Sequence, residues 1–302
     1  MYTSTLFFLA GLTAAAPTKR IWYPAAGTSW QIVLNQKVSI DTALSFDAQV
    51  YDLDLFETSA ATINDLHNNG KRVICYFSAG SYEPYRPDSS QFKDSDMGSV
   101  MEGWEDEKWL KITSSNVRKI MTARIALAAS KGCDAIDPDN VDGYSNANGI
   151  NLQKADAIKY VQWMSKQATS RGMSIGLKNA GEMVKQVLPS VQFSVNEQCH
   201  QYEECALYQP FIKANKPVFN IEYPDSDSDS DSVEGTSRIS EENDLCNSPA
   251  TKSAGFSTVL KNMDLDISIQ ECPASQNYSR TPAPTFSAAT ANSKVAKKKA
   301  SM

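Results

Sequence analysis

A chain of 302 residues, of which 41% are hydrophobic, can bury the core of one large domain or of two small ones. Its formal net charge is −6, but residues 274–302 carry five Lys and Arg residues and no acid, which leaves a net charge of −11 for the rest of the chain. This acidic body argues against nucleic acid as a partner and suits a cationic or neutral ligand. No apolar run is long enough to span a membrane.

The N-terminus indicates an exported protein. A short apolar stretch at residues 6–12 precedes Ala14-Ala15-Ala16, which offers a small-residue cleavage site, so a signal peptide is expected over residues 1–16. The basic segment that usually opens such a peptide is missing, and a plain apolar strand is the alternative. We therefore expect a secreted, extracellular protein that is monomeric and free of the membrane once the leader is removed.

Six cysteines fit an oxidising compartment. The pairs that we expect are Cys199 with Cys205, Cys246 with Cys272, and Cys75 with Cys133, although sequence alone leaves other pairings open. Metal binding is the rival use of cysteine. It has little support, because the chain has no CxxC motif and only two histidines, His67 and His200. No metal or other cofactor is expected.

Strand-like and helix-like stretches alternate along the chain. Apolar runs predict strands at 30–34, 49–56, 71–80, within 132–144, and at 173–179, 191–197, 217–223 and 255–262. Helical spacing and stop signals predict helices at 58–69, 115–131, 152–171, 180–188, 203–214 and, weakly, 237–245. Residues 81–110 are polar, contain Pro84 and Pro87, and are expected to form a long loop.

Eight strands in alternation with helices predict an α/β fold, a (β/α)8 TIM-type barrel over residues 17–273. A doubly wound open sheet is the rival, but it would usually show a Gly-rich phosphate loop after an early strand, and none is present. The Asp-Ser repeat at 225–232 is expected to be a solvated acidic loop within the barrel domain. The basic tail at 274–302 is expected to be disordered.

Carboxylates gather where strands end. Asp137, Asp139 and Asp142 follow an apolar run, and Asp137 and Asp139 point to the same face of a strand. Like charges this close repel, so the cluster indicates a functional site rather than a solvated or calcium-binding loop. Barrel active sites lie at the carboxyl ends of strands, where the chain also has Asp52, Asp54, Tyr76, Lys178, Asn179, Glu197, Glu222 and Tyr223.

Glycoside hydrolysis is the chemistry that uses paired carboxylates without a cofactor. One carboxyl group protonates the leaving oxygen, and the other attacks the sugar or activates water. Serine hydrolysis has little support, since no GxSxG motif is present. A non-catalytic glycan-binding barrel and a metal-dependent hydrolase that uses the Asp cluster are the alternatives.

Seven segments, in order, make the chain from Trp30 to Tyr223 resemble glycoside hydrolase family 114, the secreted endo-α-1,4-polygalactosaminidases. They are WQI at 30–32, VYDLDLF at 50–56, VICYFSAGSYE at 73–83, DPDNVDGY at 137–144, GLKN at 176–179, NEQC at 196–199 and NIEY at 220–223.

The resemblance implies a barrel that cleaves α-1,4-linked galactosamine in cationic polysaccharides such as galactosaminogalactan, and a glycosidase of another α-glycan is the alternative. Carried over by motif, the family's acidic pair corresponds to Asp139 and Glu197, which would act as acid/base and nucleophile in an order left open. The resemblance also implies substrate-binding roles, in which acids hold amino groups or hydroxyls and the other groups position sugar rings, for Asp52, Asp54, Tyr76, Asp137, Lys178, Asn179, Glu222 and Tyr223.

Overall fold

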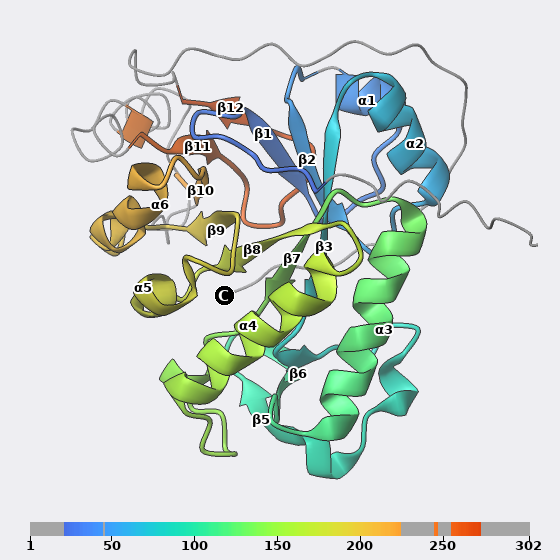
Figure 1. The fold of residues 1–302 in the computed structure, drawn as a ribbon, viewed down its shortest axis with the longest axis vertical. Coiled ribbons are helices and arrows are strands. Elements are labelled where there is room, and N and C mark those ends of the chain that lie inside the picture. Colours follow the sequence, from blue (N-terminus) through green and yellow to red (C-terminus); the bar gives the residue numbers. More distant parts are fainter. Residues whose placement is uncertain (1–20, 45, 225–244, 247–254, 273–302) are drawn as a thin grey trace, which may run out of the picture.

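The computed structural model describes residues 21–44, 46–224, 245–246 and 255–272 (Figure 1). Eight parallel strands follow one another around a single sheet in chain order. They are β1 (Trp30–Val33), β2 (Val50–Asp54), β3 (Arg72–Ser78), β7 (Ala135–Asp139), β8 (Ser174–Lys178), β9 (Phe193–Glu197), β10 (Val218–Glu222) and β11 (Ser257–Leu260). A short strand, β12 (Gln270–Glu271), pairs antiparallel with β11.

The sheet curls until its first and last parallel strands meet. The indole Nε1 of Trp30 donates to the Ser257 carbonyl at 2.8 Å, and the Ser257 hydroxyl donates to the Thr28 carbonyl at 2.7 Å. Trp30 also stacks on Phe219, with ring centroids 5.0 Å apart, across the inside of the sheet. The predicted (β/α)8 barrel is confirmed, and the doubly wound open sheet is excluded.

Helices cover the outer face of the sheet. α3 (Ser115–Lys131) and α4 (Lys154–Thr169) lie side by side along it, and α2 (Ala60–Asn68) covers β3 (Figure 1). Ser59 and Ser114 cap the first turns of α2 and α3, because their hydroxyl oxygens accept from backbone amides that have no partner within the helix. These three helices confirm the sequence prediction to within two residues.

The remaining helices are short. The stretch predicted as a helix at 180–188 divides into a 3-10 turn, η4 (Gly181–Met183), and α5 (Val184–Val187). The stretch at 203–214 divides in the same way into η5 (Cys205–Tyr208) and α6 (Gln209–Lys213), and α1 (Ile40–Leu44) was not predicted. The Asp-Ser repeat and the basic tail lie outside the described residues. So does the helix predicted at 237–245, apart from its last residue.

The prediction of a long loop at 81–110 is wrong. The segment contains a three-stranded antiparallel sheet in the order β4 (Ser81–Tyr82), β6 (Trp104–Leu110), β5 (Met97–Met101), with 3-10 turns η1 (Ser89–Gln91) and η2 (Asp94–Asp96) before β5. The sequence of β6 looks polar because Glu105, Asp106 and Lys108 face solvent, while Trp109 and Leu110 are buried. Backbone hydrogen bonds between these three strands thus give the segment a regular structure that its polar sequence did not predict.

Two large hydrophobic clusters lie on the two faces of the barrel strands. Outward side chains of the strands pack against the helices, and large inward side chains fill the barrel itself. Gly176 on β8 leaves room for the ring of Phe193, because a Cβ there would lie 2.3 Å from the ring. Since apolar groups fill the amino-terminal part of the barrel, polar inward groups gather at the carboxyl ends of the strands.

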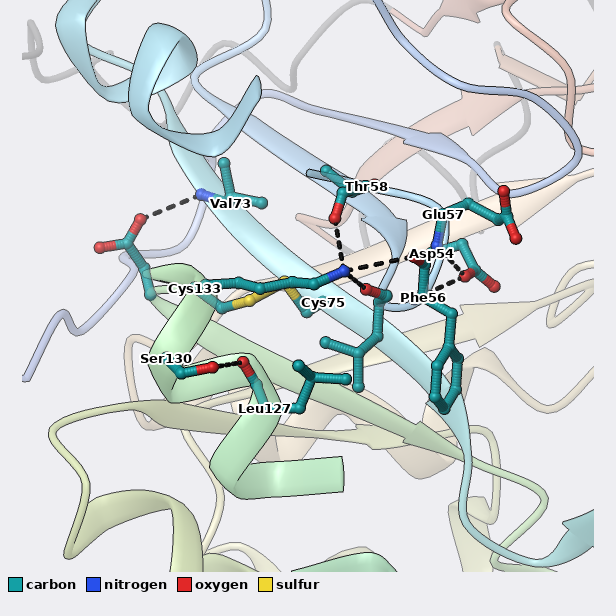
Figure 2. The surroundings of a disulfide bond; sticks show 12 residues. Asp54, Phe56, Glu57, Thr58, Val73, Cys75, Leu127, Ser130 and Cys133 are labelled. Atoms are coloured by element: carbon teal, nitrogen blue, oxygen red, sulfur yellow. Dashed lines mark hydrogen bonds between the residues drawn. A yellow bond between two sulfur atoms is a disulfide. The ribbon is translucent and has the colours of Figure 1, made fainter. Parts of the chain in front are cut away.

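The three expected disulfides, Cys75–Cys133, Cys199–Cys205 and Cys246–Cys272, are all present. Figure 2 shows the first, which joins β3 to the turn that follows α3. Gly132 makes that turn possible with a left-handed backbone, φ 94°, at the C-cap of α3. Of the helices that the structure describes, none has the length and apolar character needed to cross a bilayer.

Candidate active site

A cavity of about 660 Å³ opens at the carboxyl ends of the strands. Four residues from neighbouring strands form its floor. Asp139 ends β7, Lys178 ends β8, Glu197 ends β9, and Tyr223 directly follows β10. Parallel strands in register bring their last inward side chains to one level, which is why residues far apart in sequence meet here.

A single ammonium group joins the two predicted catalytic carboxylates. The Nζ atom of Lys178 lies 3.1 Å from Oδ2 of Asp139 and 3.0 Å from Oε2 of Glu197. Burial alone would lower the pKa of Lys178, but the two carboxylates raise it well above its usual value. Lys178 therefore carries a positive charge between them.

Glu197 is held by three side chains. Tyr223 donates its hydroxyl to Oε1 at 2.6 Å, and the amide of Asn179 donates to Oε2 at 3.0 Å while its carbonyl accepts from the Glu197 backbone at 2.9 Å. Burial acts to raise the pKa of Glu197, but Lys178 and these donors outweigh it and hold the pKa below its usual range. The carboxylate form is the stable one.

Asp139 has its own set of donors. Tyr76 donates its hydroxyl to Oδ2 at 2.8 Å, and the backbone amide of Asn140 donates to Oδ1 at 2.6 Å. Burial and the charge of Asp139 raise the pKa of Tyr76 well above its usual value, so this hydroxyl keeps its proton and acts as a donor. The donors to both carboxylates thus come from strands and from the residues directly beyond them.

The backbone is left-handed directly after these strands. Asn140, Asn179 and Gln198 follow β7, β8 and β9 and have φ values of 60°, 45° and 58°. Non-glycine residues adopt this conformation at a cost, and such strain concentrates at functional sites. Positive φ values thus mark the residues directly beyond the three strands that end in Asp139, Lys178 and Glu197.

Asp52 and Asp137 lie below the cavity floor rather than on it. Both side chains are fully buried, neither residue lines the cavity, and no described donor group reaches their carboxylate oxygens. Burial raises the pKa of Asp137 to about 8, and burial reinforced by the charge of Asp137 raises the pKa of Asp52 well above its usual value. The geometry therefore offers no direct ligand contact to these two acids.

Asp54 and Glu222 also lie outside the cavity lining. Asp54 accepts from the amides of Phe56 and Glu57 at 2.9 and 3.0 Å (Figure 2) and pairs with Arg86 at 2.7 Å. Glu222, which is 2% exposed, accepts from the His200 amide at 2.9 Å and from Asn220 at 3.0 Å. Both acids hold loops that follow strands, so their oxygens serve the protein itself.

Metal binding gains no support from the described residues. One group of Cys, His, Asp and Glu side chains among them has metal-like spacing, and it consists of Cys199, Cys205 and Glu222. Its two cysteines form a disulfide, so the group has no thiolate to offer.

The cavity walls contain residues that sequence reasoning did not assign to the site. Among the residues that the structure describes, the lining has eight acids and one base, Lys178. Beyond the predicted catalytic pair the acids are Asp142, which belongs to the predicted aspartate cluster, and five that the sequence did not assign: Glu102, Glu107, Glu182, Glu204 and Asp264. Aromatic side chains stand among them: Trp104, Trp109, Tyr144 and Tyr202. These residues lie in loops and in the β4–β6–β5 sheet, where no apolar run marks a strand end; the aromatic content of 81–110 was the one available signal.

Two carboxylates that share one ammonium, at the carboxyl end of a parallel barrel and inside an acidic cavity, fit the paired-carboxylate chemistry of glycoside hydrolysis. The sequence model of glycoside-hydrolase family GH114 matches residues 11–277, and the chain belongs to that family. None of the curated proteins compared with the chain matches it.

Solved structures agree with the family. The crystal structure of Aspergillus fumigatus Ega3 in complex with galactosamine is 48% identical to this chain, has a TM-score of 0.77, and is matched over 84% of this chain and 99% of its own. The glycoside hydrolase domain of PelA from Pseudomonas aeruginosa is 12% identical, with a TM-score of 0.60 and coverage of 79% and 96%. At that identity, PelA shows the shared fold alone.

Proposed function

We propose that this glycoside hydrolase is a secreted, endo-acting enzyme that cleaves α-1,4-linked galactosamine within a cationic polysaccharide, with Asp139 and Glu197 as its catalytic pair. The observation that carries the proposal is that Lys178 contacts both of these carboxylates. They lie on the floor of a cavity whose described lining has eight acids and one base. The galactosamine bound by the Ega3 crystal structure supports the same sugar here.

The acidic walls suit an amino sugar. At neutral pH each galactosamine unit carries an ammonium group, and a cleft of one charge sign concentrates ligands of the opposite sign. Trp104, Trp109 and Tyr202 supply flat faces in the same cavity, against which sugar rings can pack. The open cavity, with walls from several loops, supports binding in the middle of a chain rather than at its end.

The shared contact with Lys178 favours a retaining reaction. Retaining enzymes have their two carboxyl groups about 5–5.5 Å apart, and inverting enzymes need about 6.5–9.5 Å to admit a water. Oδ2 of Asp139 and Oε2 of Glu197 each lie about 3 Å from Nζ of Lys178, so these two oxygens are at most about 6 Å apart, which is nearer to the shorter class. One carboxylate would then attack the anomeric carbon, while the other donates a proton to the leaving oxygen and later deprotonates water.

Incubation with a deacetylated α-1,4-galactosamine polymer tests the proposal. We expect internal cleavage, seen as an early fall in mean chain length, and products whose first-formed anomer is α by NMR. Binding without shortening would establish the glycan-binding alternative, and a first-formed β anomer would exclude the retaining reaction.

Secretion is tested by expression of the full chain and N-terminal sequencing of the exported protein, which should begin at Pro17.

A further inference from the structure

A chain of hydrogen bonds between side chains connects the cavity wall to the backbone beside Asp139. Glu107 of β6 lines the cavity but is only 3% exposed, and its Oε2 accepts from the hydroxyl of Ser81 at 2.7 Å. The hydroxyl oxygens of Ser81 and Ser78 are 2.6 Å apart, and the side-chain amide of Asn140 donates to them at 3.3 and 2.9 Å. The chain therefore joins the β4–β6–β5 sheet, the end of β3 and the residue that follows β7.

The direction of each bond in this chain is determined, because a serine hydroxyl has one proton to donate. The proton of Ser81 goes to Glu107, so the oxygen of Ser81 accepts from Ser78. Ser78 in turn accepts from the side-chain amide of Asn140 and from the backbone amide of Ser81, the latter at 3.0 Å. The NH2 group of Asn140 is thus held toward β3 and β4, and the chain ends on the carboxylate of Glu107.

The backbone of Asn140 is held as firmly as its side chain. Its φ of 60° is left-handed, and its carbonyl lies so close to Gly80 that a Cβ there would be 1.6 Å from the oxygen. The amides of Ala79 and Gly80 donate to the carbonyl of Asp139 at 2.8 and 3.0 Å. These contacts direct the backbone N–H of Asn140 to Oδ1 of Asp139, at 2.6 Å.

We propose that Ser81 and Glu107 are positioning residues of the active site. They act on Asp139 through Asn140, because they hold the side chain whose backbone N–H fixes Oδ1. With Oδ1 held in this way, Oδ2 stays directed to the ammonium of Lys178 at 3.1 Å. Loss of the chain frees the Asn140 side chain, relaxes the left-handed turn and releases the carboxylate from its orientation. The inference rests on the proposed function wherever activity is the readout.

Ser81→Ala tests the proposal. Ser81 is 0% exposed and does not line the cavity, so any effect on the rate has to pass through its neighbours. We expect kcat on the galactosamine polymer to fall about 5–30-fold, since a misplacement of about 1 Å can cost about 100-fold. KM should change less than about twofold, because the residues that line the cavity are unaltered.

Ser194→Ala is the matched control. Ser194 is also 0% exposed and does not line the cavity, and its hydroxyl donates to the Leu177 carbonyl at 3.0 Å, outside the chain. Both variants lose one buried hydroxyl, so they should lose similar stability in urea denaturation. The control should keep the wild-type kcat, and equal losses of kcat in both variants would overturn the proposal.

A double variant shows whether Ser81 acts through Asn140. Asn140→Gly removes the side-chain amide, while glycine adopts the left-handed backbone without cost. If the two residues belong to one chain, Ser81→Ala combined with Asn140→Gly should be no slower than Asn140→Gly alone, because coupled residues have non-additive effects. Losses that multiply would overturn the proposal.

NMR gives a readout that needs no substrate. In protein labelled with 15N-asparagine, the backbone amide proton of Asn140, identified by its absence from Asn140→Gly, should resonate downfield because a short bond to a carboxylate is strong. It should move upfield in Ser81→Ala and stay in place in Ser194→Ala. An unchanged resonance in Ser81→Ala, or a wild-type kcat in that variant, would overturn the proposal. If the resonance moves as expected but the wild-type protein cleaves no glycan, only the proposed function fails.

Discussion

Asp54 on β2 and Arg86 in the loop after β4 form a buried ion pair, 2.7 Å apart, and both side chains are about 5% exposed or less. Arg86 also contacts Glu83 at 2.8 Å through Nε, and Glu83 is fully buried. The pair anchors the 81–110 segment, and with it one wall of the cavity, to the barrel.

Arg86→Met should destabilise the protein by about 3–5 kcal/mol, because it leaves Asp54 buried without its ion-pair partner and leaves Glu83 with the longer contact to Arg124, at 3.7 Å. Urea denaturation followed by circular dichroism measures the change in the free energy of unfolding. Lys154→Met is the control, since Lys154 pairs with Glu182 at 2.7 Å on the exposed surface, and loss of such a pair costs less than about 1 kcal/mol. Equal effects in both variants would show that Arg86 does not anchor the segment.

Replacement of either carboxylate of the proposed catalytic pair should remove activity. We expect Asp139→Asn and Glu197→Gln each to lower kcat by about 10²–10⁴-fold or more, with little change in thermal stability, because each replacement is isosteric and keeps its donors close. Product sizing on the galactosamine polymer measures the rate. If either variant turned over at the wild-type rate, that residue would not belong to the pair.

The roles within the pair can be separated with azide. Alanine in place of the nucleophile leaves room for azide to attack directly, which gives a glycosyl azide of inverted configuration. Alanine in place of the acid/base lets azide attack the glycosyl-enzyme, which gives the retained configuration. We expect one outcome from Asp139→Ala and the other from Glu197→Ala. The same configuration from both would contradict a retaining pair.

Tyr223→Phe should affect both activity and the pH dependence of stability. The hydroxyl helps to lower the pKa of Glu197, and a lowered carboxyl pKa contributes stability above the unfolded pKa of about 4.3 that is lost as pH falls through the folded value. The stability difference between wild type and variant should therefore shrink below about pH 4, and kcat should fall about 10–100-fold. Tyr160→Phe, whose hydroxyl donates to the Ala79 carbonyl away from the cavity, should show neither effect.

The acidic walls should make binding dependent on salt and on substrate charge. Glu102→Gln combined with Glu204→Gln should raise KM for the deacetylated polymer about 3–10-fold at low salt, and high salt should reduce that difference because exposed charges are screened. The test compares KM at two ionic strengths. A similar KM for fully N-acetylated polymer, which lacks the ammonium groups, would argue against charge as the basis of recognition.

Apolar runs were sufficient to locate the barrel strands, because strands buried on both faces are mostly apolar. Asp139, Lys178 and Glu197 could be found from sequence for the same reason, since each ends such a run. The partners of Asp54 and Glu222 could not be found from sequence. Arg86 and the His200 amide come from loops, and no local sequence pattern predicts the path of a loop. The β4–β6–β5 sheet was missed because its exposed face is strongly charged.

The common level of three strand ends also bears on how this protein can change over time. The separation of Asp139 and Glu197 is fixed by hydrogen bonds between β7, β8 and β9, and the chain between β7 and β8 leaves and rejoins the barrel without altering it. Insertions and deletions in the loops and helices between strands can therefore reshape the cavity walls, and so the choice of glycan, while the distance between Asp139 and Glu197 stays constant.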